Sequence, residues 1–218
     1  DIVEWRADTF LSSLVGSHFV AASDVEEDLV RMARYVADSS PLPVLATIRT
    51  SVEGGEAYLD DDEYCALVRR LASFAGGVDV EISCDGSSAL IDEVHEAGAI
   101  VVASFHDFEG TPGDEQLAEV LAAMNYAGAD VLKFACMANS ATDAARVLAA
   151  QAWAREAYDR PVIGISMGEH GAPTRLVGSA LGSAATFATL PGWEGSAPGQ
   201  FTVEQVRTVL DITEGAEA

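Results

Sequence analysis

Lysine is almost absent from this sequence. Of its 12 basic residues, 11 are arginines, and Lys133 is the only lysine. An arginine stays protonated and cannot act as an amine nucleophile, whereas a lysine amine in an apolar setting can lose its proton and attack a carbonyl. Lys133 lies in the apolar run 130–137, which is typical of a buried strand with one polar interruption. A lone strand lysine is ordinarily a solvated edge charge, but the scarcity of lysine favours a chemical role here.

Other scarce features narrow the class of protein. The longest apolar runs, such as 97–105 and 147–154, are too short to span a bilayer, and no signal-peptide pattern opens the sequence. The three cysteines, Cys65, Cys84 and Cys136, are an odd number and contain no CxxC pair. We therefore expect reduced thiols in a cytoplasmic protein, and no metal site built from cysteine.

Positive charge is scarce as well, because the formal net charge is −23. A surface of this sign repels nucleic acid backbones and anionic membranes, so neither is an expected partner. We expect a small-molecule substrate and a homodimer, and an anionic substrate would have to be held by locally concentrated arginines. Adaptation to high salt and a genome that favours arginine codons both explain the composition.

Strand-like apolar runs recur along the sequence, separated by helical patterns. Such alternation predicts a parallel sheet, either closed as a (β/α)₈ barrel or open and doubly wound. The 218 residues fit a single domain better than two. The seven predicted strands are 2–5, 43–48, 78–82, 99–105, 130–135, 161–166 and 184–190.

The helical patterns have the period and the stop signals of amphipathic helices. The last helix begins at Thr202, where Thr202 and Gln205 are spaced as a capping box. The predicted helices are 25–37, 60–75, 87–97, 115–127, 140–158, a short one at 175–182 and the one that begins at Thr202.

Polar residues at the carboxyl ends of the strands distinguish the two architectures. An open sheet gathers its site at one switch point, whereas a barrel brings the ends of many strands to one axis. Because polar residues follow most of the strands, we predict a TIM barrel that forms one catalytic domain over residues 1–218. We count seven strands, and Asp1 lies within the first, so we expect the first barrel strand to be absent. The strand-end residues are Glu4, Arg6, Arg49, Ser83, His106, Lys133 and Ser166.

His106 and Lys133 stand at the ends of two consecutive strands, one β/α unit apart. A lysine that forms an imine and a histidine that moves a proton are the minimum set for Schiff-base chemistry on a ketone. Glu53 could orient the imidazole and fix its tautomer. The alternative interpretations are a structural histidine and a solvent-facing loop carboxylate.

In its motifs the sequence resembles the type I 3-dehydroquinate dehydratases over nearly its whole length. Thr174 stands where many members of that family have serine, and residues 191–194 lengthen the approach to Ser196. The family also has residues ahead of its Glu-x-Arg strand that this sequence lacks. The motifs that carry the resemblance are residues 1–8 (DIVEWRAD), 47–49 (TIR), 53–55 (EGG), 104–106 (SFH), 133–135 (KFA), 165–168 (ISMG), 174–175 (TR), 182–187 (GSAATF) and 196–200 (SAPGQ).

The resemblance implies a set of roles. Lys133 would form the imine with the ring ketone of 3-dehydroquinate, His106 would be the general base and acid, and Glu53 would steer His106. Loss of water and hydrolysis would release 3-dehydroshikimate, with no metal or organic cofactor. Arg175 would bind the substrate carboxylate as a guanidinium fork. The implied substrate-binding residues are Glu4, Trp5, Arg6, Arg49, Arg175, Ser196 and Gln200.

Two other functions stay open on the sequence alone. A class I aldolase would share the lysine but break a carbon–carbon bond, and it would typically want a phosphate site. A non-catalytic barrel that binds a ligand or partner would have no reason to keep a single lysine together with His106 and Glu53.

The remaining histidines and one loop complete the expectations. His18 and His95 have no predicted role, and solvent exposure is the favoured interpretation of His170. The segment 191–200 is rich in turn-forming residues and carries two of the predicted ligand contacts, so we expect it to order over a bound ligand as a lid.

Overall fold

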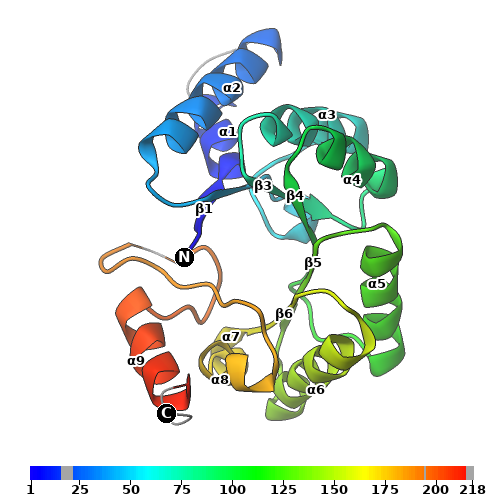
Figure 1. Ribbon diagram of the computed structural model, residues 1–218, viewed down its shortest axis with the longest axis vertical. Helices are drawn as coiled ribbons and strands as arrows, with labels where there is room; N and C mark the ends of the chain where they lie inside the picture. Colours follow the sequence, from blue (N-terminus) through cyan, green and yellow to red (C-terminus); the bar gives the residue numbers. More distant parts are fainter. Residues whose placement is uncertain (16–21, 194, 215–218) are drawn as a thin grey trace. The chain divides into compact units, whose positions relative to one another are not determined.

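The computed structural model describes residues 1–15, 22–193 and 195–214. These residues form two compact units (Figure 1). Unit 1 consists of Asp1–Ser104 with Tyr126–Asp130, and unit 2 consists of Phe105–Asn125 with Val131–Ala218. His18, which was predicted to have no role, lies outside the described residues.

The sheet of unit 1 consists of parallel strands in chain order, β1 to β4. Every residue of β3 is buried, although the strand carries two carboxylates. The carboxyl end of β4, from Phe105 on, belongs to unit 2. The strands are β1 (Val3–Arg6), β2 (Val44–Thr47), β3 (Gly77–Glu81) and β4 (Ile100–Asp107).

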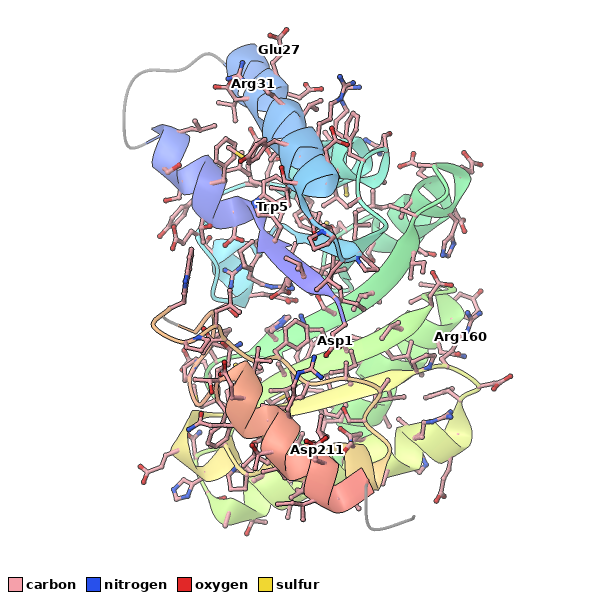
Figure 2. The ribbon with its side chains drawn as sticks, turned by 60° about the vertical axis from the view of Figure 1, so that its left-hand side comes forward. Asp1, Trp5, Glu27, Arg31, Arg160 and Asp211 are labelled. Carbon is pink, nitrogen blue, oxygen red and sulfur yellow. The ribbon has the colours of Figure 1, made fainter. Side chains whose placement is uncertain are left out.

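Helices alternate with these strands and turn one face to the sheet. In α2, Leu29 and Ala33 are buried, whereas Glu27 and Arg31 extend into solvent (Figure 2). This spacing is the one-sided apolar stripe of an amphipathic helix. The helices of unit 1 are α1 (Ala7–Val15), α2 (Ala22–Ser39), the 3₁₀ turn η1 (Ser51–Glu53), α3 (Asp61–Ala72) and α4 (Ser87–Glu96).

Unit 2 contains β5 (Val131–Met137) and β6 (Val162–Met167), which pair in parallel. One face of this pair is apolar and forms a cluster around Ile163, Ile165 and Met167. Its helices are α5 (Asp114–Tyr126, except its last residue), α6 (Ala141–Ala157), α7 (Gly168–Gly171), α8 (Thr174–Val177), the 3₁₀ turn η2 (Ser179–Leu181) and α9 (Val203–Glu214).

Side-chain caps fix where several helices begin. Asp60 accepts a hydrogen bond from the amide of Glu63, whose side chain accepts one from the amide of Asp60. The capping box predicted at the last helix is confirmed, because Gln205 Oε1 accepts from the Thr202 amide at 2.9 Å and Thr202 Oγ1 accepts from the Gln205 amide at 3.3 Å. Such caps satisfy amide groups that the first helical turn leaves without partners.

The α/β class is confirmed, and the alternation of strand and helix is that of a (β/α) barrel, of which the described residues contain six strands. The strand predicted at 184–190 is wrong. Within the described residues, that segment makes one isolated bridge, from Thr189 to Thr202, and a second bridge joins Ser183, just before it, to Val162, so no continuous ladder forms. Among the described residues, no helix combines the length and hydrophobicity needed to cross a membrane.

We predict that Gly55→Ala destabilises the protein. The turn that follows β2 folds back so closely that a Cβ on Gly55 would lie 2.1 Å from the carbonyl oxygen of Arg49. The backbone must move to relieve this clash, which should lower the free energy of unfolding by about 1–3 kcal/mol. Urea denaturation measures the change. Gly113→Ala is the matched control, because a Cβ there meets no atom within 4 Å, and a loss of the same size in both variants would contradict the prediction.

Candidate active site

A fully enclosed guanidinium forms the centre of unit 1. Arg49 follows β2 and is 4% exposed. Its Nη1 donates to Glu53 Oε2 at 3.1 Å, to Glu81 Oε1 at 2.9 Å and to Ser104 Oγ at 3.0 Å. Its Nη2 donates to Asp79 Oδ1 at 2.6 Å. Three carboxylates, one from η1 and two from β3, therefore meet one arginine.

A second ring of donors holds these carboxylates. The Thr50 amide and hydroxyl donate to the two oxygens of Glu81, at 2.8 and 2.7 Å. Ser83 Oγ donates to Glu53 Oε1 at 2.5 Å, and Ser104 Oγ donates to Asp79 Oδ1 at 2.6 Å. The network is built from the ends of β2, β3 and β4, where parallel strands present their side chains to one edge.

The charges in this network do not balance, because one guanidinium faces three carboxyl groups. Burial, opposed by Arg49 and reinforced by the neighbouring Glu81, raises the pKa of Glu53 to about 8. Burial also raises the pKa of Glu81. Burial alone would lower the pKa of Arg49, but Asp79, Glu81 and Glu53 more than offset it, so the pKa of Arg49 is raised. The network therefore keeps its arginine charged and favours a proton on a carboxyl group near neutral pH.

The Glu-x-Arg strand β1 places its polar residues differently. Arg6 forms a bidentate pair with Asp8, in which Nε donates to Oδ1 at 2.7 Å and Nη2 donates to Oδ2 at 2.6 Å. Glu4 accepts a hydrogen bond from Thr47 Oγ1 at 3.0 Å. Because neighbouring strand residues point to opposite faces, Trp5 leaves this face and packs against Phe10 of α1 with ring centroids 6.4 Å apart (Figure 2).

Lys133 lies in unit 2, in the middle of β5, and is 4% exposed. It pairs in register with Ile163 of β6, so its side chain shares a face with Ile163 and Ile165. Its Nζ lies over the ring of Phe187, 4.6 Å from the centroid, close enough for a cation–π contact. The only lysine is thus in an apolar environment, as the sequence predicts.

Arg175 of α8 is buried in unit 2 with most of its donors unused. Its Nη2 donates to the carbonyl of Pro198 at 3.2 Å, while Nε and Nη1 are buried and have no hydrogen-bond partner among the described residues. Burial lowers the pKa of Arg175 to about 10, with no carboxylate to oppose it. An arginine with idle buried donors is prepared to bind an anion.

The other predicted residues of unit 2 lie on β4 and on the segment before α9. His106 is half-buried near the carboxyl end of β4, whose last residues belong to the same unit as Lys133. Gln200 and Ser196 bind each other, through Gln200 Nε2 to Ser196 Oγ at 3.0 Å and the Ser196 amide to Gln200 Oε1 at 2.9 Å. His170 is exposed, as expected.

The structure also adds residues that the sequence did not single out. Asp79 and Glu81 bind Arg49. The sequence feature that could have indicated them is the alternation of apolar and acidic residues, Val-Asp-Val-Glu, in a buried strand. Phe187, the last residue of the motif at 182–187, was not predicted to contact Lys133. In the part of the chain that the structure describes, no group of three or more His, Cys, Asp or Glu residues is arranged to hold a metal ion.

Comparison with known proteins places the chain in a family. The family model described as type I 3-dehydroquinase matches residues 1–217. The chain belongs to this family. A 3-dehydroquinate dehydratase from Klebsiella pneumoniae (strain 342) is 37% identical over 217 residues, which cover 97% of this chain and 82% of that protein.

Solved structures of type I 3-dehydroquinases and their relatives agree with the match. The 3-dehydroquinate dehydratase from Geobacillus kaustophilus HTA426 superposes with a TM-score of 0.87 at 33% identity, covering 100% of this chain and 82% of that one. The type I enzyme from Clostridium difficile, determined with covalently modified comenic acid, gives a TM-score of 0.81 at 30% identity, covering 99% and 83%.

We predict that Glu53 makes this type I 3-dehydroquinase less stable as pH rises. Its pKa is about 8 in the folded protein against an ordinary value of 4.5, so the folded state holds the proton more tightly between those values. The free energy of unfolding therefore falls as pH rises through this window, and the penalty is complete above about pH 8. In Glu53→Gln, a neutral amide replaces the protonated acid. Its loss of stability from about pH 5 to pH 8.5 should be smaller by at least about 1.4 kcal/mol, the equivalent of one pKa unit.

Urea titrations at a series of pH values measure this difference. Glu119→Gln, on an exposed position of α5, is the control and should keep the pH dependence of the parent. A Glu53→Gln profile parallel to that of the parent would show that the cluster carries no such proton.

Proposed function

We propose that this chain dehydrates 3-dehydroquinate to 3-dehydroshikimate, a hydro-lyase reaction of the shikimate pathway, through an imine on Lys133. The observation that carries the proposal is the only lysine of the chain, enclosed on an apolar strand face beneath Phe187. A lysine amine can attack a ketone and form an imine, which the guanidinium groups of the 11 arginines cannot do.

The reaction needs a proton carrier beside the imine, and we assign His106 to it. Lys133 Nζ adds to the ring ketone and water leaves, which gives an iminium that draws electrons from the neighbouring carbon. His106 removes the proton from that carbon and then gives it to the departing hydroxyl, so that a second water leaves. Hydrolysis of the product iminium restores the lysine. His106 takes up one proton and returns one, so it ends the cycle in its starting form, and the scheme requires no cofactor.

Arg175 is our choice for the substrate carboxylate. Its idle, buried Nε and Nη1 would gain two charge-assisted hydrogen bonds, and the anion would repay part of the desolvation that lowers the pKa of this arginine. Ser196 and Gln200, which follow in the same unit, would contact the substrate hydroxyls.

In unit 1 we assign Glu4, Arg6 and Arg49 to substrate binding and Glu53 to the orientation of His106. Trp5, predicted as a further substrate contact, packs against Phe10 on the other face of β1, so we assign it to the support of this strand. Arg49 is saturated by carboxylates and Ser104. Its contribution would therefore be a fixed positive charge and the placement of Glu53, rather than a free fork. We also propose that the protein acts in the cytoplasm as a homodimer.

We predict that borohydride traps the substrate on Lys133. Reduction of the imine attaches the ligand to Nζ, and trypsin then fails to cleave after this residue. The ligand should appear on a peptide that spans residues 71–146, since Arg70 and Arg146 are the flanking cleavage sites. Mass spectrometry of the digest locates it.

Two lysine variants and one histidine variant complete the test. Lys133→Arg keeps the positive charge but cannot form an imine, so both it and Lys133→Ala should lose trapping and turnover. His106→Ala should still be trapped but lose roughly 10²-fold or more in kcat. Dehydratase activity of Lys133→Ala within a few-fold of the parent would refute the Schiff-base mechanism, and cleavage of a carbon–carbon bond would indicate an aldolase.

We predict that Arg175→Ala weakens substrate binding more than it slows chemistry. Removal of a charge-assisted bidentate contact should raise KM by about 10-fold or more, because hydrogen bonds to charged groups are worth about 1.5–3 kcal/mol. Steady-state kinetics from the absorbance of the enone product measure KM and kcat separately. Arg146→Ala is the control, since its partners Asp114 and Asp143 form surface ion pairs. An unchanged KM in Arg175→Ala would exclude it as the carboxylate site.

A further inference from the structure

Two thiols of unit 1 lie beside each other. Cys65 is in α3 and is partly exposed, and Cys84 is in the connection from β3 to α4 and is 8% exposed. Their Sγ atoms are 3.7 Å apart, whereas a disulfide bond measures about 2.05 Å. Closing the bond therefore requires the sulfurs to approach by less than about 2 Å. The third cysteine, Cys136, is fully buried in β5 of the other unit.

Hydrogen bonds hold the two segments together around this pair. The amide of Asp85, next to Cys84, donates to Asp61 Oδ2 at the start of α3, at 3.0 Å. Tyr64, next to Cys65, accepts a hydrogen bond from the amide of Glu81 at 2.8 Å. Each thiol thus has a neighbour in sequence that binds the opposite segment. The pair is pre-positioned, which lowers the entropy that a cross-link must overcome.

The pair is also linked to the carboxylate network. Ser83 precedes Cys84, and its hydroxyl is the donor 2.5 Å from Glu53 Oε1. The backbone between Glu81 and Cys84 is restrained, because the Cys84 amide donates to the carbonyl of Glu81 at 3.2 Å. Because Ser83 adjoins Cys84 in this hydrogen-bonded turn, we expect a shift of the Cys84 backbone toward α3 to move Ser83 as well.

We propose that Cys65 and Cys84 are a redox site, at which a reversible disulfide ties α3 to the β3–α4 connection and draws Ser83 away from Glu53. The oxidant is a low-molecular-weight disulfide. The Cys65 thiolate attacks it, which forms a mixed disulfide and releases one small thiol. The Cys84 thiolate then attacks the Sγ of Cys65 and releases the second. Two protein thiols lose two electrons and two protons, and one small disulfide becomes two thiols.

The surroundings set the speed of this exchange. Burial raises the pKa of Cys65, with Asp61 and Asp62 adding to the shift and Arg69 opposing it. Burial, the contact with Cys65 and the proximity of Asp61 raise the pKa of Cys84 as well. The thiolate is the reactive form, so oxidation is slow at neutral pH and accelerates as the pH rises. A brief oxidant exposure leaves the pair reduced.

Tryptic mapping tests the bond directly, because each cysteine falls in a different peptide. Cys65 lies in 50–69, Cys84 in 71–133 and Cys136 in 134–146. The intact chain is incubated with glutathione disulfide at mildly alkaline pH, alkylated and digested without reductant. A peptide pair 50–69 with 71–133, lighter by two hydrogen atoms than the sum of its parts, is the expected product. It should persist in Cys136→Ala and vanish in Cys65→Ser. Alkylation of both thiols, or a cross-link to 134–146, would overturn the proposal.

Stability and activity test the consequence of the bond. The oxidised parent should melt several degrees higher than the reduced parent, since the cross-link restricts the unfolded chain, and Cys65→Ser should show no such shift. The activity arm rests on the proposed function. There, kcat/KM should fall several-fold on oxidation, return with dithiothreitol and stay constant in Cys65→Ser.

The two claims fail in different ways. A cross-linked parent with unchanged kcat/KM would contradict the link from Ser83 to Glu53. Absence of dehydratase activity in the reduced parent would contradict the proposed function, and the peptides and the melting temperature would then decide the redox site by themselves.

Discussion

The buried guanidinium of Arg49 is the interaction on which unit 1 depends. It binds the carboxylate of Glu53 on η1 and the carboxylates of Asp79 and Glu81 on β3. It also binds a hydroxyl group on β4. Each carboxylate is buried, so removal of the arginine would leave uncompensated buried charge and lower the free energy of unfolding. The arginine therefore makes the ends of β2, β3 and β4 mutually dependent, and it fixes Glu53 by contact rather than by packing alone.

The two inward arginines of this family member illustrate opposite uses of one side chain. Arg49 has acceptors for both of its terminal nitrogens, so its hydrogen bonds hold the protein's own side chains. Among the described residues, Arg175 has one carbonyl partner and two buried donors without partners, which is why we propose that it binds the substrate carboxylate. The directions of their pKa shifts follow from this difference, because carboxylates raise the pKa of Arg49 while burial without an anion lowers that of Arg175.

Hydrophobic periodicity and the polar residues at strand ends are local signals, and they predicted the features of the fold that depend on neighbouring residues. Six strands, the apolar position of Lys133 and the cap at Thr202 follow from apolar runs and residue spacing. The segment 184–190 has strand composition but no partner strand, and composition cannot reveal that. α1 was missed because its helical pattern begins directly after β1. The partners of Arg49 and the Cys65–Cys84 contact join positions far apart in sequence, so only the fold could bring them together.

The idle donors of Arg175 have a consequence for the free energy of the empty protein. A charged group that has left water and has partners for only some of its donors makes the folded state less stable than its packing would allow. Selection for the most stable chain would replace this arginine by an apolar residue of similar length. On the proposed function, α8 is therefore a place where stability is given up for the recognition of an anion.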